Sequence, residues 1–386
     1  MHVALLSIGY PPYYTFGGSE TYVELLSKEL TKSDIDVTVI AGWPRREVSV
    51  ESLGSRLKVI RLPVIDKPLH TVWYQLLNQD TIIKLLRKVD VVHCNNLLTS
   101  LINEKIMNEK PLIIGVHGSL DALSAYLSAL RKRTLSIGDL FYLMEYPLIR
   151  SFYLKDLLHS NALIFIANHA YHEALKYLGD KSSSIPSKSA IIYPGINLEG
   201  ISVNRAKSYD SGETETAYVG RLFWPKGITY AINAFNIIVN EMGEKKAKLH
   251  VLGDGPLRGW IMRYVKKHRL AKNIKIYGQV SRDLVMRSLS QIRVIIHPSL
   301  YEGCPYVLLE ANALGLPMVT FDLAWSQEFI TDGVNGYRSP PFDVHKLAEN
   351  VLKATSLKPS LIKEEAKKFD IHITAKKTLE IYNKLL

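Results

Sequence analysis

Hydrophobic residues in the first half of the chain form short continuous runs that alternate with helical patterns. The first run, Val3–Ile8, leads through a loop to Tyr22, Leu26 and Leu30, which recur on one face of a helix. Runs of Val, Ile and Leu that alternate with amphipathic helices are typical of a parallel sheet buried between helices. Further strands are predicted at Val37–Ala41, Leu57–Leu62, Val89–His93, Leu112–Val116, Leu163–Ala167 and Ala190–Tyr193, with helices at Tyr74–Lys88 and His169–Leu178.

A polar segment from about Asn197 to Thr214 interrupts this alternation and is the best linker candidate. A second α/β series follows it. We therefore predict an α/β protein with two Rossmann-like domains, residues 1–197 and 198–370, and a C-terminal helix within 371–386. The strands predicted for the second series are Thr216–Val219, Lys248–Leu252, Ile274–Tyr277, Val294–His297 and Met318–Phe321, with helices beginning near Lys226, Pro256, Asp283 and Pro305.

Composition supports a folded protein of two domains. The 386 residues are 47% hydrophobic and 22% charged, which suits two cores rather than a disordered chain. The N-terminus lacks the features of a signal peptide and no apolar run reaches about 18 residues, so we expect a cytoplasmic protein. Cys94 and Cys304 lie far apart without metal-ligand spacing, which predicts reduced packing residues.

The formal net charge of +11 is distributed unevenly along the chain. Residues 1–200 carry +2, with 21 Lys and Arg against 19 Asp and Glu, and residues 201–386 carry the remaining +9. Such a field favours anionic ligands, whether nucleotide sugars, nucleic acid or acidic membrane surfaces. Because no nucleic-acid-binding module is evident, we expect no nucleic-acid partner.

Loops that follow predicted strands carry the candidate binding residues, because open parallel sheets bind ligands beyond the carboxyl ends of their strands. Gly17 and Gly18 lie in the first such loop, where glycines let backbone N–H groups approach an anion, although a structural turn explains them equally well. His117 follows the strand Leu112–Val116. It is either a ligand of a sugar hydroxyl or a satisfied structural histidine.

Two loops of the second series combine glycines with charged residues. Gly220 and Arg221 follow one strand and Lys226 precedes the next helix, so a guanidinium and an ammonium flank a helix N-terminus that could bind phosphate; solvated surface charge is the alternative. Gly253 and Asp254 follow the next strand. Alone they indicate a turn, with Asp254 as a helix N-cap rather than a catalyst.

The most specific stretch runs from residue 297 to residue 317 and contains two glutamates that are separated by seven residues. Glu302 lies in the loop after a strand, and Glu310 lies on the helix that begins near Pro305. Two carboxylates at this spacing can accept hydrogen bonds from two diols, while the N–H groups at the helix start meet a phosphate between them. Glu310 as a buried structural acid is the alternative. The other candidate donor-binding residues here are Gly303, Cys304, Tyr306 and Val307.

The carboxylate pair Asp34 and Asp36 resembles a metal site only superficially. It lies at the start of a predicted strand, away from the edge where ligands bind. We therefore predict no metal ligands.

Taken together, these motifs resemble the retaining glycosyltransferases of family 4, over essentially the whole chain. The resemblance implies the GT-B fold, in which two Rossmann-like domains face each other across a cleft and the last helix, here about Ile373–Leu386, packs back on the first domain. It also implies a nucleotide-diphosphate sugar, linked to UDP, GDP or ADP, as donor substrate, and no cofactor.

The resemblance assigns a role to each matching residue. It implies that Arg221 and Lys226 hold the diphosphate, Glu310 the ribose and Glu302 the donor sugar. His117 would contact that sugar from the other domain, and Gly18 would lie near the phosphates. One departure concerns the loop after Met318–Phe321, where many members have a Gly-Gly pair and this chain has Leu323-Ala324-Trp325-Ser326. The identity of the donor is open for this reason.

The reaction implied is transfer of a glycosyl group to an acceptor hydroxyl with retention of configuration. Cationic side chains and helix N–H groups would stabilise the leaving phosphate without a metal, and domain closure would exclude water. No general base is assigned, and His117 is expected to position the sugar. An NDP-sugar epimerase or sugar phosphorylase on the same architecture and a non-catalytic nucleotide-sugar-binding protein stay open as alternatives.

The acceptor is not identified by the sequence; a glycan, a lipid-linked acceptor and a small molecule stay open. Residues 123–158 combine the basic cluster Arg131–Arg133 with an aromatic, apolar stretch. Such a segment is either a set of core helices with a solvated basic corner or a membrane-facing surface that reaches a lipid-linked acceptor on the inner face of the membrane.

Overall fold

A computed structural model describes residues 1–13, 17–65, 70–95, 102, 106, 109–118, 137–201 and 214–386. These residues form two compact units. The first comprises the described residues of Met1–Leu123, Ile137–Asn197 and Phe369–Leu386, and the second those of Leu198–Lys368. Most of the predicted linker Asn197–Thr214 and the cluster Arg131–Arg133 lie outside the described residues.

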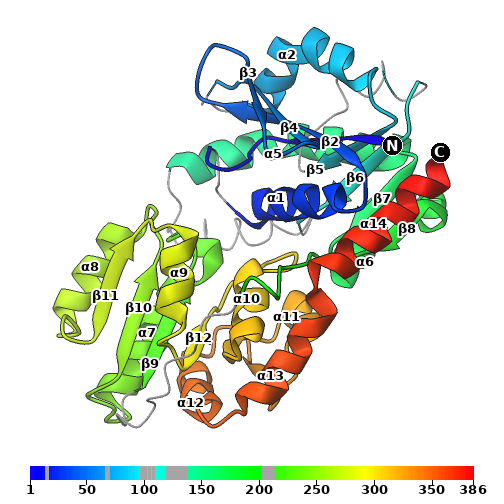
Figure 1. Cartoon of the computed structure of the whole chain (residues 1–386). Coiled ribbons are helices and arrows are strands. Elements are labelled where there is room, and N and C mark those ends of the chain that lie inside the picture. The colour runs from blue at the N-terminus through cyan, green and yellow to red at the C-terminus, as the bar shows by residue number, and fades with distance from the viewer. Residues whose placement is uncertain are drawn as a thin grey trace. The chain divides into compact units, whose positions relative to one another are not determined.

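The first unit is built on an eight-stranded sheet in the order β3-β4-β2-β1-β5-β6-β7-β8 (Figure 1). Every neighbouring pair is parallel except β3 and β4, which are antiparallel. The strands are β1 (His2–Ser7), β2 (Asp36–Trp43), β3 (Ser49–Ser52), β4 (Leu57–Pro63), β5 (Val91–Asn95), β6 (Leu112–Val116), β7 (Ala162–Phe165) and β8 (Ser189–Ile191), and the helices are α1 (Gly18–Thr31), α2 (His70–Leu86), α5 (Ile137–His159), α6 (Asn168–Leu178) and α14 (Ile371–Leu385).

The second unit repeats the plan with a six-stranded parallel sheet in the order β11-β10-β9-β12-β13-β14. Its strands are β9 (Glu215–Val219), β10 (Lys248–Leu252), β11 (Ile274–Gly278), β12 (Val294–Ile296), β13 (Met318–Phe321) and β14 (Gly336–Ser339). Its helices are α7 (Ile228–Asn240), α8 (Arg258–Lys267), α9 (Arg282–Leu289), α10 (Tyr306–Leu314), α11 (Ala324–Phe329), α12 (Val344–Ala354) and α13 (Pro359–Ala366).

The last helix belongs to the first unit, as predicted. α14 contacts α1, and Figure 1 shows the two helices, red and blue, on this unit. Asp370 begins the helix by accepting a hydrogen bond from the backbone N–H of His372 at 2.9 Å. Tyr382 is fully buried and contributes its hydroxyl to the interior of the first unit.

The structure confirms the predicted fold class and adds two strands that the hydrophobic pattern did not reveal. β3 is a short edge strand whose residues are mostly exposed, and β14 follows a turn and has only two fully buried positions. Neither has the continuous buried run by which the other strands were recognised. Within the part of the chain that the structure describes, no helix is long and apolar enough to cross a membrane.

Candidate functional site

The loop after β9 packs tightly against the loop after β10. The N–H of Gly220 donates to the carbonyl of Leu252 at 3.0 Å, and the N–H of Leu222 donates to the carbonyl of Asp254 at 2.9 Å. A Cβ on Gly253 would lie 2.0 Å from the carbonyl oxygen of Gly220, so no other residue fits this position without moving the backbone. The two predicted glycine loops therefore form one backbone surface.

Arg221 lies on this surface with an exposed side chain. Its guanidinium carbon lies 4.4 Å from the centroid of the Phe223 ring, a cation–π contact. The hydroxyl of Tyr218 lies 3.0 Å from the carbonyl oxygen of Arg221 and 3.2 Å from that of Lys226, which holds the intervening backbone in shape. The Arg221 guanidinium is thus available to an anion, while the Tyr218 hydroxyl fixes the backbone of Arg221.

Lys226 and Glu302 form a closely paired ion pair. The Lys226 Nζ lies 2.6 Å from the Glu302 Oε1, and the Glu302 side chain is only 11% exposed. His297 donates from Nε2 to the same carboxylate oxygen at 3.0 Å. Burial alone would raise the pKa of Glu302, but the Lys226 ammonium and the His297 hydrogen bond lower it to about 2. Glu302 is therefore a carboxylate with one oxygen already occupied.

His297 was not predicted as a site residue, although it directly follows β12 and precedes Glu302 by five positions. Its ring stacks on Tyr218 at a centroid distance of 6.4 Å and meets the edge of Trp325 at 6.0 Å. Trp325 is buried and donates from Nε1 to the backbone carbonyl of Ser299 at 3.1 Å. Two aromatic rings thus fix the imidazole that holds Glu302.

Glu310, on the second turn of α10, has a different environment. Its carboxylate pairs with Arg282, the first residue of α9, at 3.0 Å. Burial raises its pKa in spite of the opposing effect of Arg282. Arg282 was not predicted, because it lies 28 residues before Glu310 and only the packing of α9 beside α10 brings the two together.

The residues between the two glutamates lie at the start of α10. Pro305 is the N-cap rather than part of the first turn, and Tyr306 and Val307 begin the helix, whose first turn contains no acidic residue. Such a helix start favours an anion. Gly303 and Cys304 are buried in the preceding loop, and burial, with Glu328 and Glu302 nearby, raises the pKa of the Cys304 thiol.

Asp254 is not a helix N-cap, and that prediction was wrong. α8 begins at Arg258 with Leu257 as its N-cap. The Asp254 carboxylate instead accepts a hydrogen bond from the N–H of Gly255 and pairs with Arg258, both at 2.7 Å. Pro256 and Leu257 form a turn, so the helix begins only at Arg258.

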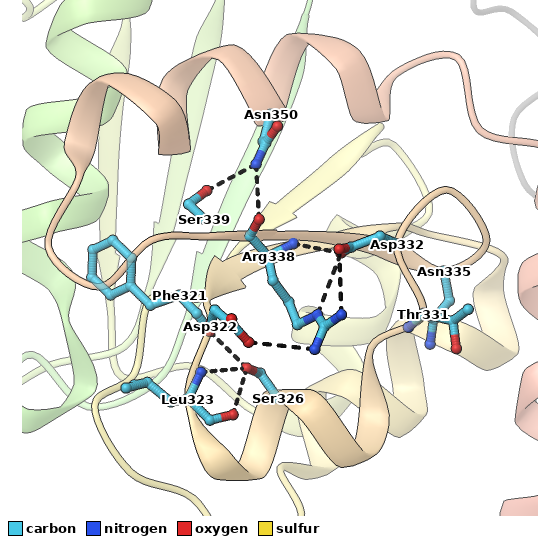
Figure 2. Close-up of polar contacts among 10 residues, drawn as sticks. All are labelled: Phe321, Asp322, Leu323, Ser326, Thr331, Asp332, Asn335, Arg338, Ser339 and Asn350. Carbon is cyan, nitrogen blue, oxygen red and sulfur yellow. Dashed lines mark hydrogen bonds and ion pairs between the residues drawn. The ribbon is translucent and has the colours of Figure 1, made fainter.

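The loop after β13, where the chain departs from the family pattern, is ordered by polar contacts (Figure 2). The Ser326 hydroxyl accepts a hydrogen bond from the N–H of Leu323 at 2.9 Å and lies 2.7 Å from the carbonyl oxygen of Phe321. Figure 2 shows Arg338 reaching from β14 to Asp322 and Asp332. Trp325 and Ser326 therefore lie on a short helix whose start is fixed by hydrogen bonds.

In the first unit, Gly17 is the N-cap of α1 and Gly18 its first residue. Tyr10 and Pro11, which follow β1, are held from β4 by Arg61, whose side chain is 2% exposed. Its guanidinium donates to the carbonyls of Tyr10 and Pro11 at 3.0 and 2.6 Å. Sequence reasoning missed Arg61, since nothing in a strand pattern reveals what a buried arginine contacts.

His117 belongs to a polar group that we name the histidine cluster, comprising His93, Asn95 and His117. The Nε2 of His117 lies 2.8 Å from the Oδ1 of Asn95, and the ring meets Tyr22 of α1 edge-on at 4.6 Å. The Nδ1 of His93 lies 2.7 Å from the hydroxyl of Tyr382. Burial lowers the pKa of His117 to about 3, and burial together with the neighbouring His117 lowers that of His93 to about 3.

The structure thus brings the predicted residues together in two groups. Tyr22 joins the helix that starts at Gly17 and Gly18 to His117 in the first unit. The glycine loops, Lys226 and Glu302 gather in the second. Asp34 and Asp36 both pair with Arg56 on the surface, and no group of described residues could hold a metal ion.

Two family models match the chain. The model described as Glycosyltransferase Family 4 matches residues 16–199, and the model described as Glycosyl transferases group 1 matches residues 203–370. An uncharacterized glycosyltransferase of Methanocaldococcus jannaschii, MJ1607, is 24% identical over 99% of this chain and 98% of its own length. The glycogen synthase of Mycobacterium tuberculosis is 30% identical over 36% of this chain and 34% of its own.

Solved structures show the same fold. Sucrose-phosphate synthase from Thermosynechococcus elongatus matches with a TM-score of 0.79 at 19% identity, over 100% of this chain and 98% of its own. Anabaena HepE in complex with UDP-glucose matches with a TM-score of 0.70 at 16% identity, over 100% of both chains. These likenesses confirm the predicted GT-B-type fold class.

Proposed function

The chain belongs to glycosyltransferase family 4, whose members transfer a sugar from a nucleotide-diphosphate donor, and from this premise we propose a retaining transfer to an acceptor hydroxyl that needs no metal ion. The observation that carries the proposal is the Lys226–Glu302 pair. It places an ammonium and a carboxylate beside a helix start and two glycine loops.

In this proposal the diphosphate binds in the second unit between Arg221, Lys226 and the start of α10. Arg221 offers an exposed guanidinium, Lys226 an ammonium and the first turn of α10 its N–H groups. Negative charge grows on the leaving phosphate as the glycosidic bond breaks, and fixed cations and N–H dipoles stabilise that charge as a metal ion would. This is the physical basis for metal independence.

The two glutamates divide the recognition of the donor. Glu302 is ionised, Lys226 and His297 fix its position, and its carboxylate accepts hydrogen bonds from hydroxyls of the donor sugar. Glu310, on the same helix as the phosphate-binding turn, accepts hydrogen bonds from the ribose, and Arg282 orients it. The family resemblance further implies that His117, as a neutral imidazole, positions the donor sugar and that Gly18 lies near the phosphates.

A UDP-sugar is the first donor to test, since HepE, which shares the fold, binds UDP-glucose. We would incubate the full-length protein with UDP-, GDP- and ADP-sugars, with and without EDTA, and follow release of the nucleoside diphosphate for the wild type and Glu310→Ala. We expect release of one nucleotide by the wild type, unchanged by EDTA and lost in the variant.

Other outcomes separate the alternatives. Abolition of release by EDTA would contradict metal independence. Conversion of the donor to an epimer without release would indicate an epimerase, and release that depends on inorganic phosphate would indicate a phosphorylase. Donor binding without turnover, with every acceptor class supplied, would indicate a binding protein.

A further inference from the structure

The side chains of the histidine cluster are positioned more precisely than contact between His117 and a sugar hydroxyl would require. Asn95 is fully buried at the end of β5, and His117 follows the neighbouring strand β6. Gly115 lies between them. A Cβ on Gly115 would lie 2.7 Å from the Asn95 Oδ1 and 2.9 Å from the His117 Nε2, so the hydrogen bond between the two side chains forms only because this position is glycine.

The orientation of the Asn95 amide follows from its second contact. Its Nδ2 donates to the backbone carbonyl of His93 at 3.5 Å, which directs the Oδ1 toward His117. A carbonyl oxygen only accepts hydrogen bonds, so the Nε2 of His117 must carry a proton. In a neutral imidazole the other nitrogen, Nδ1, is then an acceptor.

The remaining neighbours of His117 favour the neutral ring. The Tyr22 ring contacts the His117 ring edge-on. His93 also lies next to Gly115; it is buried and hydrogen-bonded to Tyr382 of α14. None of these groups is charged at neutral pH. Because burial holds the pKa of His117 near 3, the imidazole stays neutral over the physiological range.

The geometry assigns Asn95 the role of a positioning residue that keeps His117 in the Nε2–H tautomer, so that Nδ1 accepts a hydrogen bond from a hydroxyl of the bound sugar. This inference rests on the proposed function for the identity of the hydroxyl, but the tautomer itself does not depend on activity. The acceptor nitrogen selects a sugar hydroxyl as donor and rejects a sugar whose matching group cannot donate.

The first test is ¹⁵N NMR of the histidine rings in the full-length protein between pH 6 and 8, with His117 assigned from the spectrum of His117→Gln. We expect a protonated Nε2 and an unprotonated Nδ1 throughout. A proton on Nδ1, or on both nitrogens, would overturn the inference even if the protein were an active transferase. The expected tautomer in a protein that turns over no donor would instead overturn only the proposed function.

Two variants then separate positioning from packing. Asn95→Leu removes the acceptor, so Nδ1–H becomes populated and kcat/KM falls roughly tenfold, the effect of one hydrogen bond. Asn95→Asp keeps an acceptor but adds charge that raises the pKa of His117 from about 3 toward about 5, so its activity should rise between pH 4 and pH 6 more steeply than that of the wild type.

The matched control is Asn78→Leu. Asn78 is a buried asparagine of the same unit that donates to the carbonyls of Pro63 and Tyr74 and lies outside the histidine cluster. The Asn78→Leu substitution should lower the free energy of unfolding without changing the NMR signals of the His117 ring. Equal changes of those signals in Asn78→Leu and Asn95→Leu, or a pH profile of Asn95→Asp no steeper than that of the wild type, would contradict the positioning role.

Discussion

The histidine cluster of the first unit and Glu302 of the second lie at or beyond the carboxyl ends of parallel strands, yet the histidines are neutral and the glutamate is ionised. His93 and His117 are kept neutral by burial, and their partners are an amide and a phenol. Glu302 is kept ionised by Lys226. The same fold thus provides an uncharged surface in one unit and a charged one in the other.

The difference matches what each surface is proposed to bind. A sugar hydroxyl is neutral and is recognised by directional hydrogen bonds, for which a fixed tautomer matters more than charge. A diphosphate is recognised by cations and helix N–H groups, whose effect is largest where water is excluded. The uneven charge of the sequence, +2 in the first 200 residues and +9 in the rest, follows the same division.

The largest expected effect on activity comes from removing Lys226, the cation of the second unit that pairs with Glu302. Lys226→Ala deprives the leaving phosphate of a cation and Glu302 of its partner at 2.6 Å. We expect kcat to fall by about 10²–10³-fold, the typical effect of losing one stabilising group at a reacting centre. The measurement is nucleotide release at saturating donor, with the folded fraction checked by thermal unfolding.

The control for Lys226→Ala is Lys346→Ala, which breaks an exposed Lys346–Glu349 pair of similar length, 2.7 Å against 2.6 Å. Exposed pairs contribute little to stability because solvent screens both charges, so this variant should match the wild type in both assays. Similar losses of kcat in the two variants would show that the charge at position 226 has no special role.

Arg61 extends the comparison between the two units, because it is a buried charged residue of the first unit and lies outside the histidine cluster. Arg61→Met leaves the carbonyls of Tyr10 and Pro11 without their donor, and we expect a loss of about 2–4 kcal/mol in the free energy of unfolding. Arg56→Met, which breaks exposed pairs with Asp34 and Asp36, should cost less than about 1 kcal/mol. Urea denaturation measures both, and equal losses would contradict a structural role for Arg61.

Much of this architecture was predictable from the sequence, because burial of strands leaves a direct pattern. Continuous Val, Ile and Leu runs predicted every parallel strand except β14, and the apolar face of the last helix agreed with its packing on the first unit. The position of Glu302 after a strand and of Glu310 on the next helix was also predicted. The roles of these residues in catalysis stay predictions.

The partners of the site residues could not be predicted, since they depend on packing between elements far apart in the chain. Arg282 reaches Glu310 from α9, and Tyr382 reaches His93 across 289 positions. The prediction of Asp254 as a helix N-cap was wrong because a turn of two residues precedes α8, which begins at Arg258. Sequence patterns locate the strand ends at which a site forms; the hydrogen bonds that tune its pKa values arise only in the folded chain.

The two glutamates predict opposite responses of stability to pH. The pKa of Glu302 is about 2 in the folded state and about 4.3 unfolded, so its contribution of about 3 kcal/mol is present above pH 5 and is lost as pH falls toward 2. The pKa of Glu310 is raised, so its contribution is present at low pH and is lost as pH rises through its folded pKa. Urea denaturation from pH 3.5 to 7 of the wild type, Glu302→Gln and Glu310→Gln measures both.

Relative to Glu302→Gln, the wild type should lose stability as pH falls. Relative to Glu310→Gln, it should gain stability over the same range. If both differences in the free energy of unfolding changed in the same direction with pH, the two carboxylates would share one environment and the distinction between them would fail.

The smallest expected effect tests whether the histidine cluster responds to shape rather than to charge. Gly115→Ala places a methyl group 2.7 Å from the Asn95 Oδ1, and we expect a loss of about 1–3 kcal/mol in the free energy of unfolding. Gly118→Ala, just beyond His117, is the control, because its Cβ would meet no atom of the described residues within 4 Å. Since neither histidine titrates above about pH 4, the loss in Gly115→Ala should be the same at pH 5.5 and pH 8. A loss that varied across this range would mean that a histidine of the cluster carries charge, and the contrast between a neutral first site and an ionised second one would no longer hold.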